Sequence, residues 1–256
     1  MAGLVDGRVA VVTGAASGIG RAAALALARE GARAVIVADV RKDPREGGTP
    51  TQEAIAEGGT CEGRFVQCDV SRPADLVAAV AAADEFGGID IMVNNAGIVI
   101  PKDFLDITEE DYDRQMDINA KGAFFGTQAA GKRMVDKGAG VIVNVSSILG
   151  LAGSGGVAAY SASKGAIKLI TYSAAQSLAP KGIRVNAIHP GVINTELVTG
   201  DFGLPAEMMA QVFPIPLGRP AGPDEIGDAI VLLCSDHARY MTGSSLLVDG
   251  GLLNTT

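Results

Sequence analysis

Short apolar runs alternate along this 256-residue chain with longer segments in which apolar residues recur at helical spacing. The apolar runs occupy residues 8–12, 34–38, 64–68, 89–93, 141–145, 183–188 and 246–248. The helix-like segments between them occupy residues 21–30, 52–57, 73–86, 108–137, 157–178 and 223–234. Strands that alternate with helices pair in parallel and are covered on both faces. We therefore predict a single doubly wound α/β domain over residues 1–256, with a mainly parallel sheet.

The composition supports a large core and argues against several classes of function. Hydrophobic residues make up 48% of the chain, whereas the formal net charge of −8 disfavours a nucleic-acid or anionic membrane partner. Three cysteines without a Cys-x-x-Cys pair and only two histidines give no basis for a disulfide framework, a metal site or a Ser-His-Asp mechanism. Because there is no signal segment and no apolar run near the ~20 residues of a membrane span, we expect a cytoplasmic protein.

A glycine turn follows the first strand and opens the first helix. Gly14, Gly18 and Gly20 are spaced Gly-x-x-x-Gly-x-Gly between the apolar run and an Ala- and Leu-rich helix. Glycines let the backbone approach a pyrophosphate, and a helix N-terminus offers free N–H groups to an anion. The alternative is a tight packing turn of the kind found in any βαβ unit. The turn is therefore a candidate dinucleotide site.

Asp39 ends the second strand, about twenty residues beyond the glycines, where a carboxylate accepts hydrogen bonds from an adenosine ribose. A carboxylate there also repels a 2′-phosphate, which favours NAD over NADP. Arg41 and Lys42 follow closely and could offset that repulsion, whereas Ser17 occupies a turn position where a basic residue would help to hold the phosphate. On balance the sequence predicts NAD.

Polar residues also mark later strand ends and one helix. Asp69 follows the third strand and is a candidate acceptor for an adenine amino group or, alternatively, an N-cap or turn aspartate. Residues 94–97, Asn-Asn-Ala-Gly, end the fourth strand and suit the space beneath a flat ligand; a plain Asn-Gly turn is the alternative. Asn119 falls in the middle of a predicted helix, where Asn is unfavourable, so it marks either a water relay or a local kink.

Tyr160 and Lys164 lie one helical turn apart on the helix predicted at residues 157–178, so both can face the same spot. A nearby cation favours the phenolate, so we expect Lys164 to lower the pKa of Tyr160. A tyrosine tuned in this way can exchange a proton with an alcohol oxygen. Taken alone, the pair also fits a surface lysine and a half-buried tyrosine on an amphipathic helix.

Two segments lack regular periodicity. Residues 43–59 are rich in Pro, Gly and charge, and we expect a surface loop that leads into the short helix at 52–57. Residues 193–216 include six apolar residues among glycines and prolines: Phe202, Leu204, Met208, Met209, Val212 and Phe213. We interpret this segment as a partly helical lid over an apolar pocket, with an ordinary amphipathic surface helix as the alternative.

Together these motifs resemble those of the short-chain dehydrogenase/reductase family, in the family's order and over nearly the whole chain. The matching pieces are Thr13–Gly20, Asp69-Val70, Asn94-Asn95-Ala96-Gly97, Asn119, Ser147, Tyr160-x-x-x-Lys164, Pro190-Gly191-x-x-x-Thr195, Tyr240-Met241-Thr242-Gly243 and Val248-Asp249-Gly250-Gly251. The resemblance selects Ser147 rather than Ser146, because its distance to Tyr160 matches the family's spacing.

The resemblance implies a Rossmann-type fold, an NAD site and a catalytic set. Ser147 would bind the substrate oxygen, and Tyr160 would be the general acid or base. Lys164 would hold the nicotinamide ribose, and Asn119 would anchor a water that relays protons to Lys164. The implied cofactor-binding residues are Gly14, Ser17, Gly18, Ile19, Gly20, Asp39, Asp69, Val70, Asn95, Ala96, Gly97, Tyr160, Lys164, Pro190, Gly191, Ile193 and Thr195.

The leading hypothesis is an NAD-dependent oxidoreductase, commonly a homotetramer in this family, that interconverts a secondary alcohol and a ketone. One alternative is an NADPH-dependent 3-oxoacyl-thioester reductase, which Asp39 disfavours; another is a dinucleotide-binding regulator without turnover. The substrate is expected to be small, uncharged and partly apolar, because no Arg or Lys is obviously placed to clamp a carboxylate. The apolar residues that carry this expectation are Ile98, Val99, Leu149, Leu151, Met208, Met209 and Phe213.

Overall fold

A seven-stranded sheet in which every pairing is parallel forms the centre of the protein, in the order β3-β2-β1-β4-β5-β6-β7. The computed structural model describes residues 3–201, 203, 205, 208 and 211–254. The strands are β1 (Val9–Thr13), β2 (Ala34–Asp39), β3 (Glu62–Gln67), β4 (Ile91–Asn94), β5 (Gly140–Val145), β6 (Ile183–Pro190) and β7 (Ser245–Val248). The predicted doubly wound α/β architecture is confirmed.

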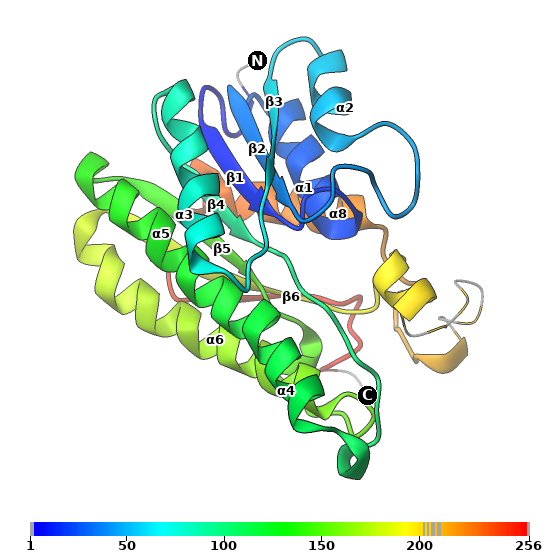
Figure 1. Ribbon diagram of the computed structural model, residues 1–256. Helices are drawn as coiled ribbons and strands as arrows, with labels where there is room; N and C mark the ends of the chain where they lie inside the picture. The colour runs from blue at the N-terminus through cyan, green and yellow to red at the C-terminus, as the bar shows by residue number, and fades with distance from the viewer. Residues whose placement is uncertain (1–2, 202, 204, 206–207, 209–210, 255–256) are drawn as a thin grey trace.

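Helices cover both faces of the sheet (Figure 1). One face packs against α1 (Gly18–Arg29), α2 (Thr51–Glu57) and α8 (Pro223–Cys234). The other packs against α3 (Pro73–Ala81), α5 (Gly122–Lys137) and α6 (Ala158–Leu178), with α4 (Glu109–Gln115) at the beginning of the α5 layer. The described helices include none that is long and apolar enough to cross a membrane.

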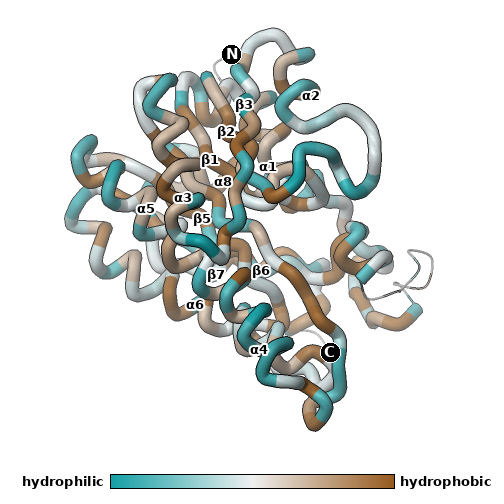
Figure 2. The backbone as a smooth tube through the Cα atoms, viewed as in Figure 1, coloured by the Kyte–Doolittle hydropathy of each residue, from teal (hydrophilic) through white to brown (hydrophobic). Residues whose placement is uncertain are grey.

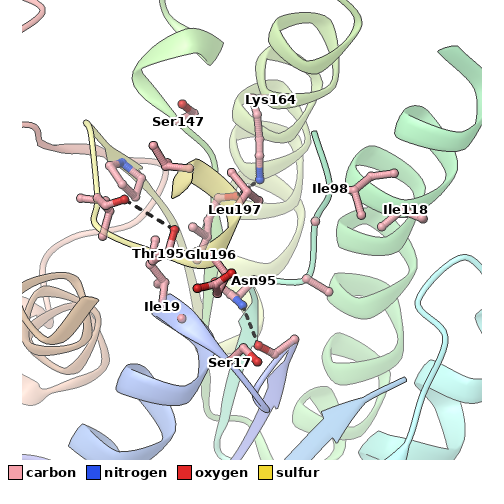
Figure 3. A pocket seen from close by; sticks show the side chains of 18 of the residues that line it. Ser17, Ile19, Asn95, Ile98, Ile118, Ser147, Lys164, Thr195, Glu196 and Leu197 are labelled. Carbon is pink, nitrogen blue, oxygen red and sulfur yellow. Dashed lines mark hydrogen bonds between the residues drawn. The ribbon is translucent and has the colours of Figure 1, made fainter. Parts of the chain in front are cut away.

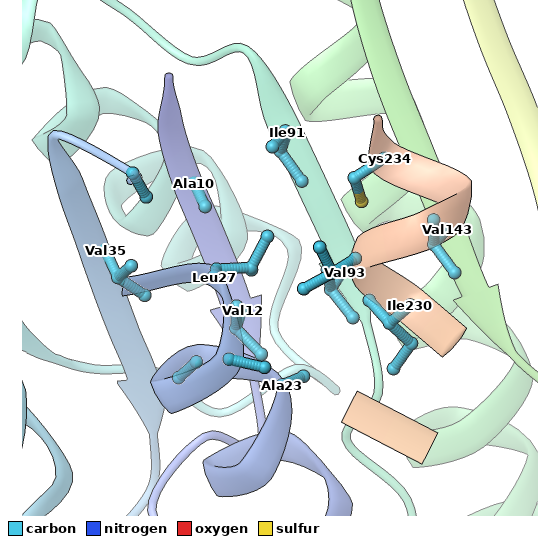
Figure 4. Packing of buried hydrophobic residues seen from close by; sticks show 14 of the residues in the cluster. Ala10, Val12, Ala23, Leu27, Val35, Ile91, Val93, Val143, Ile230 and Cys234 are labelled. Atoms are coloured by element: carbon cyan, nitrogen blue, oxygen red, sulfur yellow. The ribbon is translucent and has the colours of Figure 1, made fainter. Parts of the chain in front are cut away.

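The two cores follow from the alternation of side chains along each strand. In β1, Ala10 and Val12 face the α1 and α8 side, whereas Val9 and Val11 face the opposite side. All four are fully buried, which explains why the strands are continuous apolar runs rather than alternating ones. Figure 2 shows these runs as hydrophobic strands inside more polar helices, and Figure 4 shows Leu27 and Ile230 packed on the first face.

The helix predicted at residues 108–137 is not regular along its length. Thr108 caps α4 in a capping box with Asp111, but a π-helical turn, Met116–Lys121, separates α4 from α5. Asn119 lies in this turn, where the helix departs from regular α-helical geometry. Such turns within α-helices often occur at functional sites, because they redirect side chains.

Candidate active site

A cavity of about 380 Å³ lies at the carboxyl ends of the strands, on both sides of the point where the strand order reverses between β1 and β4. Ligands of open parallel sheets bind at this kind of reversal. Ser147 and Lys164 lie at one end of the pocket and Ser17 at the other (Figure 3). The predicted site residues that line the cavity are Gly14, Ser17, Gly18, Ile19, Asp39, Asp69, Val70, Asn95, Ala96, Gly97, Ser147, Tyr160, Lys164, Pro190, Gly191, Ile193 and Thr195.

The glycine turn needs glycine for two separate reasons. Gly14 and Gly18 have φ values of +64° and +54°, in the left-handed region that disfavours other residues. Gly20 is helical and is not among the described residues that line the cavity, but a Cβ there would lie 2.1 Å from the carbonyl oxygen of Gly14. Gly20 therefore allows the turn to pack closely against α1 instead of forming the cavity wall.

Asn95 and Thr13 join the ends of β4 and β1 beneath the cavity. The Asn95 side-chain amide donates to the carbonyl oxygens of Thr13 and Gly14 at 3.0 and 3.2 Å. The Thr13 hydroxyl accepts from the backbone N–H groups of Asn95 and Ala96 at 3.0 and 3.2 Å. These four hydrogen bonds fix the two strand ends together beneath the cavity.

The acidic end of the cavity is organised around Asp39. Its carboxylate accepts from the backbone N–H groups of Ala16 and Arg41, at 3.0 and 3.2 Å, which fixes it beside the glycine turn. Lys42, one of the two bases that could offset its charge, instead forms an ion pair with Glu53 at 2.8 Å. Arg41 does line the cavity. The Asp39 carboxylate therefore lies beside the glycine turn, where the sequence predicted a negative charge.

Asp69 is a turn aspartate and not the N-cap of α3, which is Arg72. Its carboxylate accepts from the backbone N–H and the hydroxyl of Ser71 at 3.0 and 2.7 Å, so it shapes a turn. It also lines the cavity together with Val70. The turn therefore holds an acceptor in the cavity wall.

Tyr160 and Lys164 come from the first turns of α6 and meet at the other end of the cavity. The Lys164 ammonium lies 5.5 Å from the centre of the Tyr160 ring and donates to the carbonyl oxygen of Val145 at 2.9 Å. Burial raises the pKa of Tyr160 to about 12, an effect that a hydrogen bond with Ser147 partly offsets. Burial also lowers the pKa of Lys164 to about 8.

The expectation that Lys164 lowers the pKa of Tyr160 is therefore wrong for this structure. Lys164 is buried and Tyr160 is half-buried, and burial disfavours the charged form of each. The lysine's charge is directed at a carbonyl oxygen instead of at the phenol. At neutral pH, Tyr160 is consequently a neutral phenol with a proton to donate.

Ser147 follows β5 and is held from two sides. Its hydroxyl oxygen accepts from the backbone N–H of Leu149 at 3.1 Å and so caps a short 3₁₀ turn, Ile148–Gly150. Its carbonyl oxygen lies 3.0 Å from Nδ1 of His189. The same hydroxyl shares a hydrogen bond with Tyr160, which places the two groups side by side at this end of the cavity.

His189 continues a hydrogen-bonded chain that sequence analysis did not identify. Its Nε2 lies 2.9 Å from the Ser245 hydroxyl, which lies 2.8 Å from the Tyr172 hydroxyl. A carbonyl oxygen can only accept, so Nδ1 must carry the imidazole proton and Nε2 must accept from Ser245. Burial lowers the pKa of His189, which keeps the ring neutral. The three side chains come from distant segments, so no local pattern could have revealed the chain.

Asn119 is fully buried and does not appear among the described residues that line the cavity. Its side-chain oxygen accepts from the backbone N–H of Ile98 at 2.8 Å, and its amide donates to the Ile98 carbonyl oxygen at 2.9 Å. The amide also donates to the Ser163 hydroxyl at 3.0 Å. Asn119 thus holds the chain after β4 against the helix that carries Tyr160 and Lys164.

The apolar wall of the cavity is only partly as predicted. Ile98, Leu149 and Phe213 line it, whereas Val99, Leu151 and Met208 are not among the described lining residues, and Met209 lies outside the described part of the chain. Apolar lining residues that sequence analysis missed include Val40, Ile118, Val145, Ile148, Val192, Leu197 and Val198.

The loop at residues 43–50 is more than a surface connection. Arg45 lines the cavity, and its backbone N–H donates to the Ser17 hydroxyl at 2.7 Å. The predicted surface loop is confirmed, because residues 45–49 are exposed, but its contact with the glycine turn was not predicted. Its charged, glycine-rich composition could not reveal that it folds back over the glycine turn.

Comparisons with known proteins agree with this geometry. A family model described as enoyl-(acyl carrier protein) reductase matches residues 14–253. The chain is 41% identical over 250 residues to a cyclopentanol dehydrogenase of Comamonas sp., covering 97% of this chain and 98% of the relative. It is 44% identical over 248 residues to cis-4-hydroxycyclohexanecarboxylate dehydrogenase of Sinomonas cyclohexanicum, covering 95% and 96%. A crystal structure of a short-chain type dehydrogenase/reductase from Mycobacterium marinum superposes with a TM-score of 0.89 at 37% identity, covering 98% and 97%.

Proposed function

The chain belongs to the short-chain dehydrogenase/reductase family and is an NAD(P)-dependent dehydrogenase that acts on CH–OH donors, and from this premise we propose a specific activity. The protein is an NAD-dependent oxidoreductase that interconverts a small, partly apolar secondary alcohol and its ketone. The observation that carries the proposal is one cavity that joins Asp39 and the glycine turn to Ser147, Tyr160 and Lys164.

The described residues fit a dinucleotide along the length of the cavity. The N-terminus of α1 already holds a carboxylate, that of Glu46, whose oxygen accepts from the Gly18 N–H at 3.0 Å. This contact supports an anion-binding role for the glycine turn. Asp39 would hold the adenosine ribose, and Lys164 would hold the nicotinamide ribose. When bound, the cofactor exchanges a hydride with the substrate carbon.

Side chains of the protein supply the proton and stabilise the charge that develops on the substrate oxygen. In ketone reduction, the Tyr160 phenol donates its proton to the substrate oxygen, and the Ser147 hydroxyl donates a hydrogen bond that stabilises the developing charge. A pKa of about 12 keeps Tyr160 protonated at neutral pH, which favours its role as the acid. Asn119 positions the Ile98 backbone beside the reacting end.

NAD is the proposed cofactor because Asp39 is fixed by two backbone N–H groups beside the turn. A 2′-phosphate near that carboxylate would be repelled. Because Arg41 also lines the cavity, the NADPH-dependent 3-oxoacyl-thioester reductase remains the alternative.

The substrate end favours an uncharged ring or chain. Ile98, Leu149 and Phe213 contribute apolar wall, and the names of the two relatives specify an alicyclic alcohol in one case and a hydroxycyclohexane carboxylate in the other. The two arginines that line the cavity, Arg41 and Arg45, lie with Asp39 and Ser17 at the opposite end. We therefore expect cyclopentanol to be preferred over the carboxylate-bearing alcohol.

The experiment is a turnover assay that follows reduced nicotinamide, with cyclopentanol and cis-4-hydroxycyclohexanecarboxylate each tested with NAD and NADP. The proposal expects the highest kcat/KM with cyclopentanol and NAD. Preference for the carboxylate would refute the uncharged-substrate assignment, and preference for NADP would move the thioester reductase to first place.

We also expect a homotetramer, to be measured by light scattering after size exclusion, because Tyr112, Phe124 and Leu169 are exposed on α4, α5 and α6.

A further inference from the structure

The loop between β2 and α2 is tied to the glycine turn by several hydrogen bonds. The Arg45 backbone N–H donates to the Ser17 hydroxyl at 2.7 Å, and a Glu46 oxygen accepts from the Gly18 N–H at 3.0 Å. At the far end of the loop, the Thr51 hydroxyl donates to the Ala15 carbonyl oxygen at 2.9 Å. The loop thus lies over the start of α1, where the cofactor's pyrophosphate is proposed to bind.

Glu46 occupies an anion position at the N-terminus of α1. Gly18 is the first residue of this 12-residue helix, so its N–H group has no acceptor within the helix. The positive end of the helix dipole favours an anion there. A pyrophosphate that uses this N–H group must displace the Glu46 carboxylate, so the loop is in direct competition with the ligand.

The Arg45 side chain extends from this loop to a different wall of the cavity. Its guanidinium forms two parallel bonds with the Asp201 carboxylate, at 2.9 and 2.7 Å, and the pair raises the pKa of Arg45. Asp201 ends the short helical turn Leu197–Asp201, in which Leu197 and Val198 line the cavity. Figure 1 shows the loop before α2 beside this turn, shown in yellow.

This ion pair is better shielded than other arginine–carboxylate pairs on the surface. The side chains of Arg45 and Asp201 are 34% and 32% exposed, whereas those of Arg64 and Glu85 are 49% and 54% exposed. A two-pronged Arg–carboxylate contact also fixes both partners in orientation. The Arg45–Asp201 pair is therefore placed to hold two walls of the cavity together.

We propose that the Arg45–Asp201 pair is a clasp that retains the dinucleotide by slowing its release, and that Glu46 holds the position of the pyrophosphate until the ligand displaces it. The clasp joins the loop over the glycine turn to the turn Leu197–Asp201, so a bound dinucleotide is enclosed by both. The inference rests on the proposed function, because it requires a nicotinamide dinucleotide in this cavity.

The main experiment is stopped-flow measurement of NADH release, with variants Arg45→Met, Asp201→Asn and the double variant. The Arg45 backbone N–H, which donates to Ser17, is preserved in these changes. Loss of a partly shielded ion pair is expected to speed release about fivefold in each single variant. Because both changes remove one interaction, the double variant should release NADH no faster than either single variant.

Arg64→Met is the matched control, because it removes an arginine–carboxylate pair of the same 2.7 Å length that does not line the cavity. Its release rate should equal that of the wild type. A normal release rate in Arg45→Met, or rate increases that multiply in the double variant, would overturn the clasp.

A second measurement needs no cofactor. Hydrogen–deuterium exchange of the free protein should show faster exchange at residues 195–201 in Arg45→Met and no change there in Arg64→Met. Unchanged exchange in both variants would overturn the clasp as a link between the two walls. If the wild type binds neither NADH nor NADPH, the proposed function itself fails and the clasp fails with it; NADH binding with release rates insensitive to Arg45 rejects the clasp alone.

Discussion

Replacing Asn119 with alanine should destabilise the protein strongly, although the side chain is not among the described residues that line the cavity. The change removes three hydrogen bonds of 2.8, 2.9 and 3.0 Å from a fully buried position. Two of them satisfy the backbone N–H and carbonyl of Ile98. Leaving a buried polar group unsatisfied costs roughly 1–3 kcal/mol, so two such groups imply a loss of about 3 kcal/mol or more.

The assay is thermal unfolding followed by circular dichroism at a fixed protomer concentration, because the temperature midpoint of an oligomer depends on concentration. For a chain of this size, each 1 kcal/mol shifts Tm by roughly 2–4 °C, so Asn119→Ala should lower Tm by about 6–12 °C. The control is Asp117→Ala in the same π-helical turn, which removes only an exposed ion pair with Lys121.

The control should change stability by less than about 0.5 kcal/mol, because exposed ion pairs contribute little. The reasoning is refuted if Asn119→Ala unfolds within a degree of the control. Such a result would mean that water replaces all three bonds without loss, and that the Ile98 backbone does not depend on Asn119.

Three further predictions concern the cofactor, the proton and the glycine turn. Asp39→Ser should shift the ratio of NADH to NADPH affinity toward NADPH by about tenfold, because it removes a charge that repels a 2′-phosphate; an unchanged ratio in a fluorescence titration would contradict this. The rate of ketone reduction should be constant at neutral pH and fall as the pH rises through about 8. Over this range Lys164 loses its charge, while Tyr160, with a pKa of about 12, stays protonated. A rate that rises through this range would argue against both assignments. Gly20→Ala should destabilise the fold by about 1–3 kcal/mol, because the new Cβ would lie 2.1 Å from a main-chain carbonyl oxygen. Gly153→Ala is the control and should unfold like the wild type, because a Cβ at that position meets no non-neighbouring described atom within 4 Å.

The sheet and its helices could be predicted because their signals are local. A parallel strand buried on both faces must be a continuous apolar run, as residues 9–12 are. The turn between this strand and the first helix has backbone positions with positive φ, which favour glycine. The residues of the site could be placed for a related reason. Strand ends in a parallel sheet meet at one edge, so Asp39, Asn95 and Ser147 converge once the strand order is known.

What the sequence could not predict depends on contacts between distant segments. The hydrogen-bonded chain through His189, Ser245 and Tyr172 joins three elements, and no spacing rule connects them. The pKa of Tyr160 follows from how deeply α6 is packed, not from the four-residue spacing to Lys164. The loop that carries Arg45 looked like a connection because charge and glycine content do not reveal where a loop folds.

The most direct test of the central claim is turnover and NADH binding of Tyr160→Phe beside the wild type. The phenyl ring keeps the packing of the cavity but has no proton to donate to the substrate oxygen. We predict that kcat falls by at least about 10²-fold, the lower end of what a positioned acid contributes, while NADH dissociation constants stay within about twofold. Activity retained in Tyr160→Phe with normal NADH binding would contradict the account, because another group would then be supplying the proton.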